Sequence, residues 1–295
     1  MSFSSAQLNE LANAAIEATT QAGTLIAERT GSDLNVALKS DKEDRAAQVL
    51  TEVDGLSQAT ILEILEPTIK QCDLGLLAEE SNDDQSRFEK KAFWCIDPLD
   101  GTLPFIEGDP GYAVSIALVS RDGQPLIGVV YDPRSQTLYH AIHDAGPYKN
   151  REPWKPLNER KGNQNAFLFL NDRSFVSHSD CEATLDAFES LARERGYSGL
   201  QTRFVGGAAM NAIWALENAP ACYFKFPRPK GGGSLWDYAA TACIYQEAGA
   251  IATDFQGDSF DLNRPDLNFM NHRGVIFATD QKIAAFVRAR PNELI

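Results

Sequence analysis

The stretch Trp94-Cys95-Ile96-Asp97-Pro98-Leu99-Asp100-Gly101-Thr102 decides the fold that the sequence predicts. An apolar run leads directly into two aspartates that are separated by two residues. Pro98 restricts Asp97 to extended geometry, and Gly101 permits a tight turn and a close approach to a ligand. The pattern predicts a buried strand that ends in a short loop. In that loop both carboxylates and the Leu99 carbonyl point toward one place.

Oxygen ligands gathered in this way suit a hard cation such as Mg²⁺. If Thr102 begins a helix, the N–H groups of Gly101 and Thr102 would face a phosphate. The simpler interpretation is an acidic surface turn, but a buried strand rarely leads directly into such a turn. A haloacid-dehalogenase motif, Asp-x-Asp-Gly-Thr, is excluded because it has one residue between its aspartates and usually lies near the N-terminus.

Other acidic residues lie at the ends of predicted elements. Glu79 and Glu80 follow the apolar run 74–78. Because adjacent side chains at a strand end point to opposite faces, only one of them would normally reach a given ion directly. Asp54 and Asp237 each stand at the start of a predicted helix. A solvated surface for the glutamates and helix capping for the aspartates are the simpler explanations.

The overall charge limits the classes of partner. The chain has 41 acidic and 27 basic residues, for a formal net charge of -14. This excludes a general binder of nucleic acid polymers or anionic membranes, which needs a basic face. No run approaches the roughly 18 apolar residues of a membrane span, and the N-terminus has no signal-peptide pattern. Scattered cysteines without a CxxC pair predict no zinc site or disulfide framework, so we expect a cytoplasmic protein.

Alternating apolar patterns predict a layered α/β protein. Helices are predicted at 4–30, after Asp54 to about Pro67, and at 179–195, 208–217, 237–248 and from Asp280. Strands are predicted at 74–78, 93–96, 112–120, 126–131, 137–142, 166–170, 201–205, 221–226, 250–253 and 275–278. The polar, proline-containing stretch 146–165 separates two predicted domains. These are an N-terminal α+β half, residues 1–150, and a C-terminal α/β half, residues 151–295.

In chain order, Asp54, Glu79-Glu80, the motif 97–102 and Trp236-Asp237 resemble the signature of the inositol monophosphatase superfamily. The resemblance covers nearly the whole chain. It implies an αβαβα sandwich of the inositol monophosphatase and fructose-1,6-bisphosphatase type, with metal ions at the junction of the halves. It also implies a Mg²⁺-dependent phosphomonoesterase in which a metal-activated water attacks a small phosphorylated substrate.

The resemblance further implies roles for individual residues. The implied metal ligands are carboxylates and one backbone carbonyl: Glu79, Glu80, Asp97, Leu99, Asp100 and Asp237. Glu79 and Thr102 would orient the attacking water. Asp54, a third catalytic position, would with Glu80 serve a weaker third ion or support the other ligands. Gly101 and Thr102 would bind phosphate. Two to three Mg²⁺ ions are expected, with Mn²⁺ as a substitute, Li⁺ or Ca²⁺ as candidate inhibitors, and a homodimer as the assembly.

Two segments give opposite indications about the substrate. Residues 206–211 resemble the small-residue helix start that inositol monophosphatases place near the sugar ring. Gly207 and Ala208 are therefore candidate contacts for inositol monophosphate or a related polyol phosphate. Residues 223–230 instead resemble the 3′(2′),5′-bisphosphate nucleotidases. They form a longer segment that lacks the acidic residue inositol monophosphatases use against inositol hydroxyls.

The basic side chains of Lys225, Arg228 and Lys230 could meet a second phosphate, although a solvated basic loop is the simpler interpretation. We expect the polyol ester, with 3′-phosphoadenosine 5′-phosphate as the alternative. A non-catalytic regulatory binding protein on the same fold is a third alternative. The complete set of acidic residues argues against it.

Overall fold

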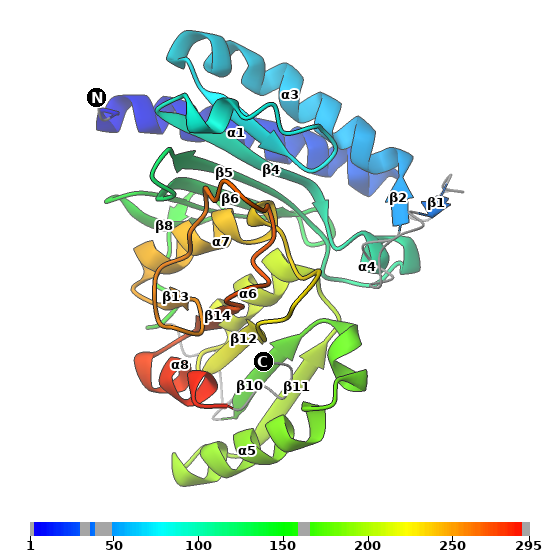
Figure 1. Cartoon of the computed structure of the whole chain (residues 1–295), viewed down its shortest axis with the longest axis vertical. Coiled ribbons are helices and arrows are strands. Elements are labelled where there is room, and N and C mark those ends of the chain that lie inside the picture. Colours follow the sequence, from blue (N-terminus) through cyan, green and yellow to red (C-terminus); the bar gives the residue numbers. More distant parts are fainter. Residues whose placement is uncertain (1–2, 30–35, 39–48, 159–165, 291–295) are drawn as a thin grey trace.

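The computed structural model describes residues 3–29, 36–38, 49–158 and 166–290, and its helices and sheets alternate in layers (Figure 1). The order is α-β-α-β-α, as the sequence led us to expect. Among the helices in these ranges, none combines the length and apolar character needed to cross a lipid bilayer.

The first sheet has seven strands, and the chain runs through them in sequence order. They are β3 (Gly75–Ala78), β4 (Ala92–Asp100), β5 (Ala113–Ser120), β6 (Pro125–Asp132), β7 (Thr137–Ile142), β8 (Gly146–Lys149) and β9 (Glu152–Pro153). Only β3 and β4 are parallel; the other neighbouring pairs are antiparallel. Strands β8 and β9 fall within the stretch predicted as a linker, of which 159–165 lie outside the described residues. The division into two domains stays a prediction.

Two long helices, α1 (Ser5–Arg29) and α3 (Glu52–Cys72), cover the outer face of this sheet. Their buried apolar residues recur at helical spacing and pack against the strands. At Gly23, a Cβ atom would lie 2.2 Å from the ring of Tyr131, so only glycine lets α1 approach β6 this closely.

Helix α3 continues past Pro67, where the sequence predicted its end. Proline removes one helical hydrogen bond, so another contact must stabilise the part of α3 that follows Pro67. The last turn is fixed to β4, because the Trp94 indole N–H donates to the Thr68 hydroxyl at 3.0 Å. Thr68 in turn donates to the Leu65 carbonyl at 2.6 Å. This tertiary contact outweighs the local signal.

The second sheet has the strand order β11-β10-β12-β14-β13. Its strands are β10 (Phe167–Asn171), β11 (Leu200–Phe204), β12 (Ala221–Lys225), β13 (Ile251–Thr253) and β14 (Val275–Ala278). Strands β10, β11 and β12 are parallel, whereas β14 is antiparallel to both of its neighbours. Helices α5 (Cys181–Glu194) and α8 (Gln281–Arg288) cover its outer face.

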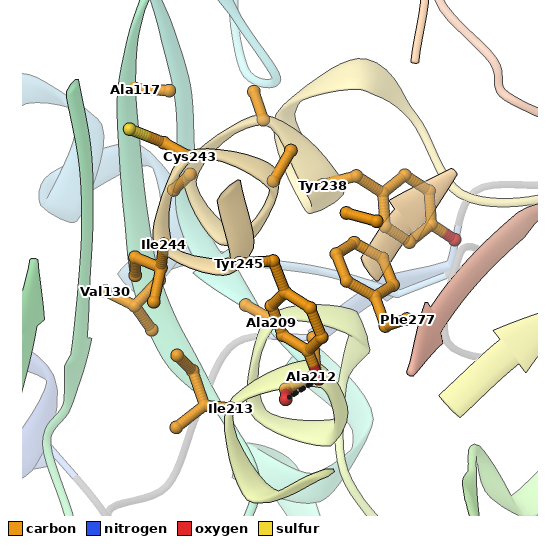
Figure 2. Close-up of a cluster of buried hydrophobic side chains, with 14 of the residues drawn as sticks. Ala117, Val130, Ala209, Ala212, Ile213, Tyr238, Cys243, Ile244, Tyr245 and Phe277 are labelled. Atoms are coloured by element: carbon orange, nitrogen blue, oxygen red, sulfur yellow. Dashed lines mark hydrogen bonds between the residues drawn. The ribbon is translucent and has the colours of Figure 1, made fainter. Parts of the chain in front are cut away.

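Helices α6 (Ala208–Glu217) and α7 (Leu235–Ala248) lie between the two sheets and share one buried core with them. Figure 2 shows Ile213 and Ile244 of these helices beside Val130 of β6. The Tyr245 hydroxyl donates to the Ala212 carbonyl at 2.7 Å and so joins the two helices. This packing fixes the N-termini of α6 and α7 relative to β4.

Shorter elements complete the described chain. They are β1 (Val36–Leu38) paired with β2 (Val49–Thr51), helix α4 (Thr102–Glu107), and the 3₁₀ turns η1 (Ser86–Phe88) and η2 (Arg173–Ser177). Helix α4 begins at Thr102, which meets the condition set in the sequence analysis for a phosphate-facing helix start.

Candidate active site

Strand β4 runs through the Asp-x-x-Asp motif, so the predicted loop is a bulged strand end. Asp97 pairs with Ser115 of β5 and Asp100 pairs with Ala113. Three steps along β4 therefore match two steps along β5. In a regular strand, residues three apart point to opposite faces, and the extra residue of a bulge changes this. The bulge thus turns both aspartates toward one side.

The two aspartates meet Asp237, which lies in the first turn of α7. One carboxylate oxygen from each residue lies within 4.8 Å of the other two. Asp97 is 2% exposed and Asp100 is 6% exposed. Burial, reinforced by Glu79, Asp100, Asp237 and Asp54, raises the pKa of Asp97 well above its usual range. Four of the predicted acidic residues therefore act on a fifth, Asp97.

Asp100 also holds the N-terminus of α6. Its Oδ1 accepts the Ala208 N–H at 3.0 Å, and its Oδ2 accepts the Ala209 N–H at 2.8 Å. Burial raises the pKa of Asp100 to about 6, although these N–H groups oppose the rise. A Cβ atom at Gly207 would lie 2.5 Å from Asp100 Oδ2, so this close approach needs glycine. The predicted substrate contacts Gly207 and Ala208 therefore adjoin a predicted metal ligand.

Asp237 caps its own helix, as the simpler interpretation had it. Its Oδ2 accepts the Ser234 N–H at 2.8 Å within a capping box. Burial, followed by the charges of Asp100 and Glu79, raises its pKa well above the usual range. Capping and membership in the acidic cluster are compatible, because a carboxylate has about four acceptor positions.

The first turn of α3 supports the motif from the other side. The helix was predicted to follow Asp54, but it begins at Glu52, and Asp54 is buried within its first turn. The Ser57 hydroxyl donates to the Pro98 carbonyl at 2.7 Å, and Gln58 Oε1 accepts the Glu80 N–H at 3.0 Å. Ser57 and Gln58 were not among the residues predicted from the sequence. The available signal was their position one helical turn after Asp54.

The remaining motif residues lie around the same strand end. The half-buried Glu79 donates its N–H to the Ile96 carbonyl at 3.1 Å, which places it beside Asp97. Gly101 has φ 85° and precedes α4. The Thr102 hydroxyl donates to the Leu99 carbonyl at 3.4 Å. The carboxylates of Glu79, Glu80 and Asp54 are outside the group of three converging oxygens found among the described residues.

The three basic residues of segment 223–230 lie in different surroundings. Lys225 forms an ion pair with Asp172. The Arg228 guanidinium lies beside Gly232, because a Cβ atom added to this glycine would be 3.4 Å from Arg228 Nε. Lys230 is exposed. The charge of Lys225 lowers the pKa of Asp100.

A second group of side chains with metal-binding atoms lies at the turn between β7 and β8. It consists of His143, Asp144 and Glu247. The two Glu247 oxygens accept the backbone N–H groups of Asp144, at 3.0 Å, and Gly146, at 2.8 Å. Closure of the turn therefore accounts for Glu247 without an ion.

Comparisons with known proteins agree with this arrangement. The sequence profile of the inositol monophosphatase family matches residues 7–291. A relative from Vibrio cholerae named Nus factor SuhB is 30% identical over 272 residues, which cover 91% of this chain and 94% of that protein. An inositol-1-monophosphatase from Synechocystis is 29% identical over 286 residues, 95% of this chain and 88% of that protein. The inositol monophosphatase structure from Anabaena superposes with a TM-score of 0.68 at 21% identity, covering 96% and 97% of the two chains.

Proposed function

The chain belongs to the inositol monophosphatase family, and we propose that it is a Mg²⁺-dependent phosphomonoesterase that hydrolyses inositol monophosphate or a related polyol phosphate. The observation that carries the proposal is the convergence of Asp97, Asp100 and Asp237 within 4.8 Å. Helix capping accounts for the position of Asp237 but of no other residue in the group. It does not explain why three carboxylates meet at one point.

A divalent cation fits this donor set. Burial raises the pKa of each of the three carboxyl groups, and repulsion from neighbouring carboxylates adds to this at Asp97 and Asp237. The folded chain therefore favours any species that neutralises them. Asp97, Asp100 and Asp237, with Glu79 and the Leu99 carbonyl, would hold hard cations such as Mg²⁺. Bound ions would neutralise the phosphate and lower the pKa of the attacking water.

The chain's own groups would position the substrate. The N–H groups of Gly101 and Thr102 stand at the start of α4 and would bind phosphate oxygens. Glu79 and the Thr102 hydroxyl would orient the water for in-line attack. A formal net charge of -14 repels a phosphate ester, so cation binding would also precede productive substrate binding.

The test is phosphate release from inositol 1-phosphate, measured with Mg²⁺ and with a chelator. We expect release only with Mg²⁺, and we expect Asp97→Asn to abolish it while circular dichroism shows a folded protein. Asp186→Asn, an exposed aspartate on α5, is the matched control and should retain wild-type activity. An Asp97→Asn variant with more than a few per cent of wild-type turnover would contradict the proposal.

The length and basic residues of segment 223–230 favour a second candidate, a 3′(2′),5′-bisphosphate nucleotidase. A parallel assay with 3′-phosphoadenosine 5′-phosphate decides between the two. The Vibrio cholerae relative is named a Nus factor, which motivates a non-catalytic binding role as the contrasting proposal. The absence of Mg²⁺-dependent release from both esters would favour that role.

The same proposal includes two to three Mg²⁺ ions, replacement by Mn²⁺, inhibition by Li⁺ or Ca²⁺, a homodimer and a cytoplasmic location. Metal titration of the phosphatase activity tests the ions. Sedimentation analysis tests the assembly, and cell fractionation tests the location.

A further inference from the structure

The Lys225–Asp172 ion pair lies where two parallel strands end together. Leu170 of β10 pairs with Tyr223 of β12. Two residues further along, Asp172 directly follows the end of β10 and Lys225 is the last residue of β12. The parallel register therefore places the two side chains opposite each other, and the Lys225 ammonium contacts Asp172 Oδ2. The pair is a consequence of the sheet and does not depend on a long loop.

This edge of the sheet also borders the acidic cluster. Strand β11, parallel to β10, ends at Phe204, and the chain continues through Gly206 and Gly207 into α6. The first N–H groups of α6 bind Asp100, and the charge of Lys225 acts on the same carboxylate. In open α/β sheets, ligands bind beyond the carboxyl ends of parallel strands. A substrate whose phosphate lies at the acidic cluster would therefore extend along this edge.

The chemistry of the pair favours hydroxyl groups over a second anion. Asp172 would repel a phosphate that Lys225 attracts. A hydroxyl, by contrast, donates to a carboxylate and accepts from an ammonium, so a vicinal diol matches both partners. Asp172 is held in place, because the Ser174 hydroxyl donates to its Oδ1 at 2.5 Å. The side chains of Asp172 and Lys225 remain 26% and 24% exposed, which leaves them open to a ligand.

We propose that the Lys225–Asp172 pair binds hydroxyl groups on the alcohol part of the phosphate ester and thereby selects polyol phosphates. This inference rests on the proposed function, because it requires that a phosphate ester be hydrolysed at the adjacent acidic cluster. In this inference, Lys225 and Asp172 form a pair without net charge that binds hydroxyl groups. The charge of Lys225 alone had suggested a contact with a second phosphate.

The test compares inositol 1-phosphate with cyclohexyl phosphate, which has the same ring without the hydroxyls, in the presence of Mg²⁺. We expect the wild type to prefer the inositol ester by about tenfold or more in kcat/KM. Lys225→Met and Asp172→Asn should each lower kcat/KM for that ester by roughly ten- to hundredfold. The same variants should change cyclohexyl phosphate hydrolysis by less than about threefold. The double variant should lose no more than the worse single variant, since both residues serve one contact.

Lys282→Met, an exposed lysine on α8, is the matched control and should behave as the wild type. Equal losses on both esters would overturn the inference, because the pair would then only stabilise the site. It would also fail if the wild type prefers 3′-phosphoadenosine 5′-phosphate and Lys225→Met removes that preference. If the wild type hydrolyses none of the three esters with Mg²⁺, the proposed function itself fails.

Discussion

Replacing Asp97 with asparagine should stabilise the metal-free protein while it abolishes turnover. Asparagine has nearly the shape of aspartate but no charge, and its amide oxygen can still accept the Leu99 N–H that Asp97 Oδ1 accepts at 3.0 Å. The change therefore removes one buried charge from the cluster and keeps the local hydrogen bond. In Mg²⁺ the same change removes one of the proposed metal ligands.

The size of the effect has an upper limit. A buried carboxyl group can destabilise the folded state by at most about 1.4 kcal/mol for each unit by which the pH exceeds its pKa in the unfolded chain. For an unfolded pKa near 3.9, this limit is about 4 kcal/mol at pH 7. Beyond this limit the folded protein takes up a proton. The neighbouring Asp100, whose pKa burial raises from 3.8 to about 6, corresponds to about 3 kcal/mol. We expect Asp97→Asn to raise the free energy of unfolding by about 3 kcal/mol and Tm by roughly 5–10 °C.

Thermal unfolding followed by circular dichroism, in chelator and in Mg²⁺, measures both effects. In chelator the variant should unfold at the higher temperature. In Mg²⁺ the wild type should gain stability by ligand binding, whereas Asp97→Asn should gain little. A wild type as stable as the variant in chelator would refute the reasoning, because the cluster would then carry no strain. An equal gain in Mg²⁺ for both proteins would show that the ions bind elsewhere.

Three further outcomes follow from individual contacts. In chelator, the wild-type free energy of unfolding should fall by about 2 kcal/mol as pH rises from about 4 to about 6. The raised pKa of Asp100 makes the folded state hold its proton to a higher pH than the unfolded state does, and urea unfolding at each pH measures the fall. Ser57→Ala should lower stability by about 1–3 kcal/mol in the same urea assay, since it leaves the buried Pro98 carbonyl without its 2.7 Å donor. Gly207→Ala should lower kcat/KM by more than about tenfold, because its Cβ would lie 2.5 Å from Asp100 Oδ2. Gly55→Ala, with nothing within 4 Å, is the matched control and should be as stable as the wild type or slightly more stable.

The sequence predicted the layers and most elements because their signals are local. The bounds of α6, β7 and β14 coincide with the predicted ranges 208–217, 137–142 and 275–278. In each case an apolar pattern ends at turn or capping residues, which require no knowledge of the partner strand. The acidic residues were likewise recognisable as a set by their order along the chain.

Features that depend on a distant partner could not be predicted. The bulge in β4 is defined by its register with β5, and no residue of the motif specifies that register alone. Pro67 is a strong local signal for the end of a helix, yet the contact between Trp94 and Thr68 overrides it. The Lys225–Asp172 pair arises only when β10 and β12 lie side by side.

Asp100 shows why the fold and the candidate site have to be considered together. Helix N-termini carry partial positive charge and orphan N–H groups, and α6 directs two of these at Asp100. Asp97, by contrast, accepts the Leu99 N–H from its own strand. Since N–H donors stabilise the charged form of a carboxyl group, the N-terminus of α6 opposes the rise that burial causes in the pKa of Asp100. The helix that fixes the position of Asp100 in the candidate site therefore also favours its charged form, which is the form that would bind a cation.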